Sequence, residues 1–192
     1  MAKLIEVKID SLRVSLTNQQ RIVVLKQIDA DRFLPIWIGP YEAEAITIAL
    51  QEIEVSRPQT HDLLKNTITS LKAKLIRAVI KSLKDDIFFG VLVVEVNGKE
   101  LEIDSRPSDA IAVAIRAHVP IMVSEKVMNE ASIIPEESKQ EDEIINGEEE
   151  TQPGSDQLTL GEDRLSIFED YLEKKINQSD TEDNGLWLGN LL

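Results

Sequence analysis

The sequence predicts an α+β fold, in which a compact sheet of mixed or antiparallel strands packs against three to four helices. Apolar residues alternate or run together in several short segments before position 135, as in strands buried on one or both faces. Between these segments, apolar residues recur three or four positions apart, as in amphipathic helices. Asn97-Gly98 separates two apolar segments and is the strongest hairpin signal in the chain. A chain of 192 residues with 42% apolar content is long enough to bury one such core.

Each strand is predicted from its own pattern. Residues 3–16 alternate between apolar and polar, and the phase changes between Asp10 and Ser11, which predicts a β-bulge. Residues 74–83 are ambiguous, because their apolar stripe would continue the preceding helix to residue 84, whereas their β-branched content is typical of a buried strand. A strand is favoured. The predicted strands are residues 3–16, 21–28, 33–38, 74–83, 88–96, 100–104 and 120–123.

Four helices fill the gaps between these strands. Gly39-Pro40 starts the first helix, and Glu42 and Glu44 lie in its first turn, where negative charge is favourable. The run from Ala110 to Ile115 is apolar nearly all round, which predicts a buried helix that His118 caps. The other two predicted helices are residues 60–71 and 124–131.

The chain changes character after Pro135. Residues 1–135 hold 17 Lys and Arg against 18 Asp and Glu, whereas residues 136–192 hold 4 against 17, so the tail carries nearly all of the net charge of −14. Residues 136–160 are rich in Glu, Gln, Ser and Gly and contain few large apolar residues. We expect this segment to be disordered, because burial of so few apolar side chains cannot offset the entropy of ordering. The predicted organisation is a domain over 1–135, an acidic flexible linker over 136–160, a short amphipathic helix over 161–177 and a tail with an apolar terminus over 178–192.

Composition excludes several classes of function. The chain has no cysteine, which rules out disulfides, thiolate metal sites and cysteine nucleophiles. Charge appears too early for a signal peptide and no apolar run approaches membrane-spanning length, so we expect no membrane partner and a cytoplasmic location. The nearly neutral part before residue 136 also lacks the broad basic face of a tight nucleic-acid binder.

One sequence motif occurs twice in the chain. Residues 56–62 (SRPQTHD) and residues 105–109 (SRPSD) each place Ser-Arg-Pro in a loop and an Asp at the start of a helix. Proline restricts its own φ and the preceding residue, so each Arg leaves its loop in a restricted direction. Thr60, Ser105 or Ser108 is expected to cap a helix, and the N–H groups of a helix N-terminus attract an anion. We expect the two motifs to converge, with at least one Arg–Asp contact between their loops; the alternative is that the Arg–Asp pairs are a structural bracket.

Three segments then carry a family resemblance. They are Phe33-Leu34-Pro35-Ile36-Trp37-Ile38-Gly39-Pro40 with Glu42-Ala43 and Ala45-Ile46, Arg57-Pro58 with Thr60-His61-Asp62-Leu63-Leu64, and Asp104-Ser105-Arg106-Pro107-Ser108-Asp109-Ala110-Ile111-Ala112. In order and spacing they resemble the bifunctional nuclease (BFN) domain family of bacteria and plants, over about residues 3–133. The resemblance implies a compact α+β domain, often oligomeric, with nuclease activity on DNA and RNA. The chain departs from the family pattern at Glu52-Ile53 and at Lys72, where the family favours glycine.

The chemistry of phosphodiester hydrolysis selects the candidate site residues. Nucleases commonly activate water and stabilise phosphoryl charge with a divalent ion held by carboxylates. The candidate metal ligands are Asp62, Asp104 and Asp109, whose hard oxygen atoms favour Mg²⁺ or Mn²⁺. The candidate catalytic residues are His61, Asp62, Asp109 and Glu42, with the histidine as general base or metal ligand. The candidate phosphate-binding residues are Arg57, Arg106, Thr60 and Ser108.

Two classes of function stay open. The first is a nuclease that acts on DNA, RNA or both and forms a homo-oligomer. The second is a non-enzymatic oligomeric binding or regulatory module in which the Arg–Asp pairs are structural. In the first class the acidic tail would compete with nucleic acid for the cationic site. Alternatively, the tail docks on a protein partner through Phe168, Leu172 and Trp187.

Overall fold

The computed structural model describes residues 3–14 and 20–135. The chain divides into two compact units, Met1–Ile134 and Pro135–Leu192, and the first contains every helix and strand below. The predictions for 136–160, 161–177 and 178–192 lie outside the described residues. None of the described helices is long and apolar enough to cross a membrane.

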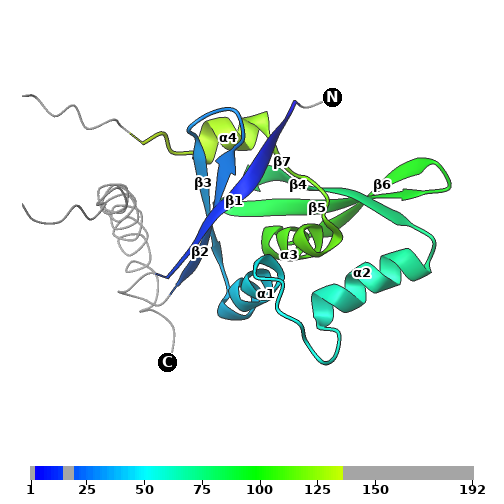
Figure 1. Ribbon diagram of the computed structural model, residues 1–192. Helices are drawn as coiled ribbons and strands as arrows, with labels where there is room; N and C mark the ends of the chain where they lie inside the picture. Colours follow the sequence, from blue (N-terminus) through cyan, green and yellow to red (C-terminus); the bar gives the residue numbers. More distant parts are fainter. Residues whose placement is uncertain (1–2, 15–19, 136–192) are drawn as a thin grey trace, which may run out of the picture. The chain divides into compact units, whose positions relative to one another are not determined.

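Seven strands form one sheet in the described part of the chain. They are β1 (Leu4–Val14), β2 (Arg21–Gln27), β3 (Phe33–Ile38), β4 (Lys74–Lys84), β5 (Ile87–Val96), β6 (Lys99–Ser105) and β7 (Ile121–Ser124). Their order across the sheet is β3-β2-β1-β7-β4-β5-β6, as Figure 1 shows. Neighbouring strands are antiparallel except β4 and β7, which are parallel, so the sheet is mixed. Pro35 lies in the edge strand β3, where a missing backbone N–H costs no ladder hydrogen bond.

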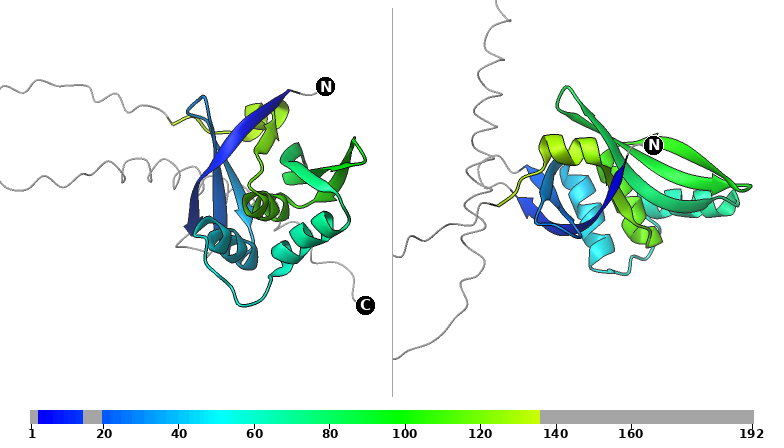
Figure 2. Two further views of the ribbon diagram at one scale, coloured as in Figure 1. Left: turned by 45° about the vertical axis from the view of Figure 1, so that its right-hand side comes forward. Right: turned by 90° about the horizontal axis from the view of Figure 1, so that it is seen from above.

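Four helices complete the described fold, which is therefore α+β as predicted. They are α1 (Pro40–Leu50), α2 (Thr60–Ser70), α3 (Pro107–Ala117) and α4 (Glu125–Ala131). α3 is the central one, since all of its residues from Ala110 to Ala114 are fully buried. α1 and α2 flank α3 on the same face of the sheet (Figures 1 and 2), and Ile46 and Ile68 join its residues in one hydrophobic cluster.

The other face of the sheet carries a smaller buried apolar cluster. Val79, Val91 and Val93 form a separate buried cluster there. Two ion pairs, Arg77–Glu100 and Lys81–Glu102, span β5 from β4 to β6 on this face. Side chains of a strand alternate between the two faces of a sheet. Leu92 and Val94 of β5 belong to the cluster of α3, so Val91 and Val93 lie on the opposite face.

The structure settles the two local ambiguities of the sequence. The register between β1 and β2 shifts between Ile9 and Ser11, which confirms the predicted bulge. Residues 74–84 are a strand, not a continuation of α2. The helix ends because Leu71 is its C-cap and Lys72 has φ of 61°, a left-handed conformation that turns the chain back toward the sheet.

The predicted helix caps were wrong. The N-cap residues are Gln59 for α2 and Arg106 for α3, in place of Thr60, Ser105 or Ser108. Pro107 occupies the first position of α3, a position that suits proline, so the cap is the residue before it. In α2, the carboxylate of Asp62 accepts the backbone N–H of Gln59 at 2.9 Å, which fixes that residue as the cap.

Candidate functional site

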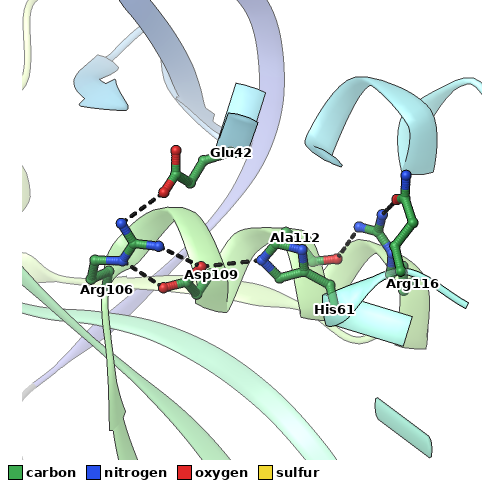
Figure 3. A network of polar contacts seen from close by, with 7 residues as sticks. Glu42, His61, Arg106, Asp109, Ala112 and Arg116 are labelled. Atoms are coloured by element: carbon green, nitrogen blue, oxygen red, sulfur yellow. Dashed lines mark hydrogen bonds and ion pairs between the residues drawn. The ribbon is translucent and has the colours of Figure 1, made fainter. Parts of the chain in front are cut away.

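The N-terminal ends of α1, α2 and α3 contribute one chain of polar contacts, drawn in Figure 3. Arg106 Nη1 lies 2.7 Å from Glu42 Oε1, and Arg106 donates from Nε and Nη2 to the two carboxylate oxygens of Asp109 at 2.7 and 3.1 Å. Asp109 Oδ1 lies 3.1 Å from His61 Nε2. Four residues from three helices thus form one network, which we call the Arg106 network.

The local sequence explains how these side chains meet. Asp109 is the third residue of α3 and Arg106 is its N-cap, so the two lie on adjacent turns of backbone. Gly90 of β5 lets the loop before α3 approach closely, because a Cβ there would lie 3.0 Å from the Ser105 carbonyl oxygen and 3.1 Å from Pro107. At Gly39, a Cβ would collide with the carboxylate of Glu42, so a larger residue there would displace this carboxylate from its position beside Arg106.

A second set of contacts ties α2 to the far end of α3. Arg116 donates from Nε to Asp62 Oδ1 at 2.8 Å, from Nη2 to Gln59 Oε1 at 2.9 Å and from Nη1 to the Ala112 carbonyl at 3.0 Å. The Arg116 side chain is only 6% exposed, whereas that of Asp62 is 29% exposed, so the guanidinium is shielded from water. Asp62 also accepts the Gln59 N–H, so both of its oxygens are occupied. We call this set the Arg116 bracket.

Electrostatics hold the Arg106 network in its charged form. Burial by itself would raise the pKa of Asp109, but hydrogen bonds from Arg106 and His61 outweigh it and hold that pKa below its ordinary value of 3.8. The same pairing with Asp109 and Glu42 raises the pKa of Arg106. Asp109 is therefore a carboxylate at neutral pH, and His61 Nε2 is the donor in their hydrogen bond.

The predicted convergence of the two motifs is confirmed through a different pair of residues. The contact between the motifs is His61–Asp109. The prediction of an Arg–Asp contact between the two loops was wrong. Arg106 pairs with Asp109 of its own motif, and Asp62 pairs with Arg116. The reason is geometric: an N-cap side chain and the third helical residue are near neighbours, which favours the local pair.

The remaining predicted phosphate ligands lie outside these contacts. Arg57 is exposed and forms no ion pair with any residue in the described ranges. Thr60 is exposed at the first position of α2, whereas Ser108 is buried within α3. Of these, Thr60 and Arg57 are accessible to a ligand from solvent.

The three predicted metal ligands do not form one site. Asp104 lies on β6 opposite Val91, on the sheet face that carries Glu100 and Glu102, away from α3. Asp62 and Asp109 are each paired with an arginine. Within residues 3–14 and 20–135, no three His, Asp or Glu side chains are grouped closely enough to hold a metal ion. The described side chains therefore do not make a metal cage by themselves.

Arg116 is the residue that sequence reasoning missed. It lies in the last turn of the apolar helix, where a basic residue is expected simply from the helix dipole. Its position seven residues after Asp109 places both on one side of α3, which was the available signal for contact with α2.

Comparison with known proteins adds a family to this geometry. A family model described as the bifunctional nuclease domain matches residues 23–136. An uncharacterised protein of Mycobacterium tuberculosis is 39% identical over 137 residues, which span 71% of this chain and 82% of the relative.

Plant relatives carry the name of an activity at lower identity. Bifunctional nuclease 1 of Oryza sativa is 31% identical over 121 residues, 60% of this chain. Bifunctional nuclease 1 of Arabidopsis thaliana is 29% identical over 107 residues, 53% of this chain. The matches cover 36% and 33% of the plant proteins, about a third of their length.

Proposed function

Because the chain belongs to the bifunctional nuclease domain family, we propose that it hydrolyses phosphodiester bonds of DNA, RNA or both, with the Arg106 network as its site. The observation that carries the proposal is the position of Arg106. Its side chain is 64% exposed although it is held by two carboxylates, so a fixed cation faces solvent beside a histidine–carboxylate pair.

Arg106 is the proposed phosphate-binding group. A guanidinium has five N–H groups, and the contacts to Glu42 and Asp109 use Nε, Nη1 and Nη2 once each. A second N–H on Nη1 and another on Nη2 stay available to the oxygens of a phosphodiester. Donors that are already oriented stabilise charge developing on those oxygens without reorganisation during the reaction. Arg57 and Thr60, both exposed in the neighbouring motif, would add contacts to the flanking phosphates.

His61 is the proposed proton-transfer group, positioned by Asp109. The carboxylate holds Nε2–H, which fixes the ring orientation and leaves Nδ1 as the nitrogen that exchanges a proton with water or with the leaving oxygen. Asp109 therefore acts through His61 and Arg106, and Glu42 steadies Arg106 from the other side. The Arg116 bracket would keep α2, and with it His61, in place against α3.

Mg²⁺ or Mn²⁺ is retained in the proposal only as an ion that arrives with the substrate. The described residues form no cage for it, but Mg²⁺ is commonly held by one or two carboxylates together with substrate phosphates. The roles given to Arg106 and His61 do not depend on such an ion.

Turnover of labelled single-stranded DNA and RNA tests the proposal, with His61→Asn and His118→Asn as a matched pair. His118 is the other histidine of the chain and forms the C-cap of α3 with φ of 52°, a conformation that asparagine also tolerates. His61→Asn should lower kcat at least tenfold, and His118→Asn should leave it within about twofold. Equal trace activity in all three proteins would identify a contaminant and refute the nuclease assignment. A parallel series with EDTA, Mg²⁺ and Mn²⁺ reports the ion requirement.

The occupied state of Arg106 favours a second candidate function. A guanidinium paired with two carboxylates can also serve only to connect helices, as a structural bracket. The chain would then be an oligomeric binding or regulatory module without catalysis. In that case the labelled DNA and RNA stay intact, and Arg106→Ala lowers only the stability of the fold, measured by urea denaturation.

A further inference from the structure

A groove lies on the side of α1 away from the Arg106 network. It has a volume of about 560 Å³ and is lined by α1 together with the adjoining ends of β1 and β2. Its apolar lining includes Leu12, Val14 and Ile48, and its charged lining includes Arg13 and Arg21. A volume of this size accommodates a ligand comparable to one or two nucleotides.

Tyr41 connects this groove to the proposed site. It lines the groove, the residue is 81% exposed, and it immediately precedes Glu42, which contacts Arg106. Consecutive residues of a helix point about 100° apart, so the two side chains leave the first turn of α1 toward different neighbours. The first turn of α1 thus separates an exposed aromatic ring from the candidate phosphate-binding arginine.

We propose that this groove binds the bases of single-stranded nucleic acid that flank the bond to be cleaved, with one base stacked on Tyr41. The inference rests on the proposed function and specifies its substrate class. An exposed aromatic ring beside cationic groups is the combination that binds single strands, since every base offers a face for stacking. Arg13 and Arg21 would accompany the phosphates of the same strand, and Arg13 is oriented by a hydrogen bond from Nε to Ser11 Oγ at 3.2 Å.

The groove favours single strands over duplexes for a physical reason. A base within a duplex has both faces stacked on its neighbours, so Tyr41 cannot stack on it unless the strands separate. The groove also carries Glu44 on its rim, which opposes a purely electrostatic attachment to phosphates. Base stacking, rather than charge alone, would therefore provide the affinity.

The test measures binding of fluorescein-labelled octathymidylate by fluorescence anisotropy, with the intact length of the probe checked on a gel. Tyr41→Ala should raise Kd by about 5- to 100-fold, the range found when a stacking aromatic residue is removed. Tyr41→Phe, which keeps the ring, should stay within about twofold. Leu71→Ala is the matched control, since Leu71 is also a large apolar side chain, 73% exposed, at the far end of α2.

Two further probes separate stacking from charge. An octamer of the same phosphates without bases should bind wild type and Tyr41→Ala equally. Arg13→Gln should reduce the slope of log Kd against log salt concentration by about 0.7, the value for one phosphate contact on a single strand. The inference is overturned if Tyr41→Ala binds octathymidylate as tightly as wild type, if wild type shows no binding, or if a duplex of equal length binds more tightly.

The outcomes distinguish this inference from the proposed function. Loss of binding in Tyr41→Ala, with no hydrolysis by wild type, would support the groove and refute the nuclease. Hydrolysis that depends on His61, with binding that ignores Tyr41, would support the nuclease and refute the groove.

Discussion

Asp62 and Asp109 are each the third residue of a helix that begins within or just after a Ser-Arg-Pro sequence, yet their surroundings differ. Asp62 is paired with Arg116, whose side chain is 6% exposed, and with a backbone N–H. Asp109 is paired with Arg106, whose side chain is 64% exposed, and with His61.

The difference teaches that a repeated motif does not imply a repeated role. Arg116 is buried between two helices, so it holds them together and its guanidinium is not accessible to a ligand. An exposed guanidinium with unused N–H groups contributes little to stability and is available for chemistry. Substitutions in the two networks should therefore have opposite effects on stability and on turnover.

Loss of the Arg116 bracket should give the largest change in stability. Arg116→Met removes the partner of Asp62 and leaves a partly buried carboxylate unpaired, which costs about 3 kcal/mol in free energy of unfolding. Urea denaturation measures the change. Arg77→Met is the control, because Arg77 pairs with the solvent-exposed carboxylate of Glu100, and such surface pairs contribute little to stability. An equal loss of unfolding free energy in Arg116→Met and Arg77→Met would show that the Arg116 bracket contributes no more than a surface ion pair.

Arg106→Ala should show the reverse pattern. Its ion pairs are exposed to water, so the free energy of unfolding falls by less than about 1 kcal/mol. Turnover of single-stranded nucleic acid should fall at least tenfold, because the oriented phosphate donor is lost. Steady-state kinetics on the folded variant provide the measurement. A variant that unfolds but turns over normally per folded molecule would reverse the roles of the two networks.

The pH dependence of stability should identify Asp109 as a charged partner. Its pKa is lowered on folding, so its contribution to stability is fully present above the unfolded pKa of about 3.8 and is lost as pH falls through the folded value. The gap in unfolding free energy between wild type and Asp109→Asn should therefore be constant from about pH 7 to 5 and shrink below about 3.8. Urea titrations across this range measure it. A gap that widens on acidification would contradict the ionised pairing.

Lys72→Gly should leave turnover unchanged and sharpen the comparison by stabilising the scaffold. Lys72 has φ of 61°, a left-handed conformation that costs a residue with a Cβ about 1 kcal/mol. Glycine at this position should raise the free energy of unfolding by about that amount without altering turnover. Lys72→Ala is the control, since it removes the charge but keeps the Cβ. If alanine stabilises as much as glycine, the lysine charge and not the backbone is responsible.

The sequence predicted the elements of the fold better than the contacts of the site. Hydrophobic periodicity and Asn97-Gly98 located the strands and helices, because these signals depend on neighbouring residues alone. The end of α2 depends on the left-handed backbone conformation of Lys72. Glycine is the residue that usually marks this conformation in a sequence, so a lysine gives no local signal for it. The ion-pair partners were harder to predict than the elements. Residue type alone allows Arg106 to pair with either Asp62 or Asp109, and only the packing of α2 on α3 selects between the two.

Turnover per folded molecule in Asp109→Asn and Asp62→Asn tests the central claim most directly. The fraction folded is taken from circular dichroism, and both variants replace a carboxylate by its amide at the same helical position. Asp109→Asn is predicted to lower kcat at least tenfold, which corresponds to about 1.4 kcal/mol in the barrier, with little loss of stability. Asp62→Asn is predicted to lose stability and to keep kcat within about threefold. Equal losses of kcat, or a larger loss in Asp62→Asn, would contradict the assignment of chemistry to the Arg106 network and of structure to the Arg116 bracket.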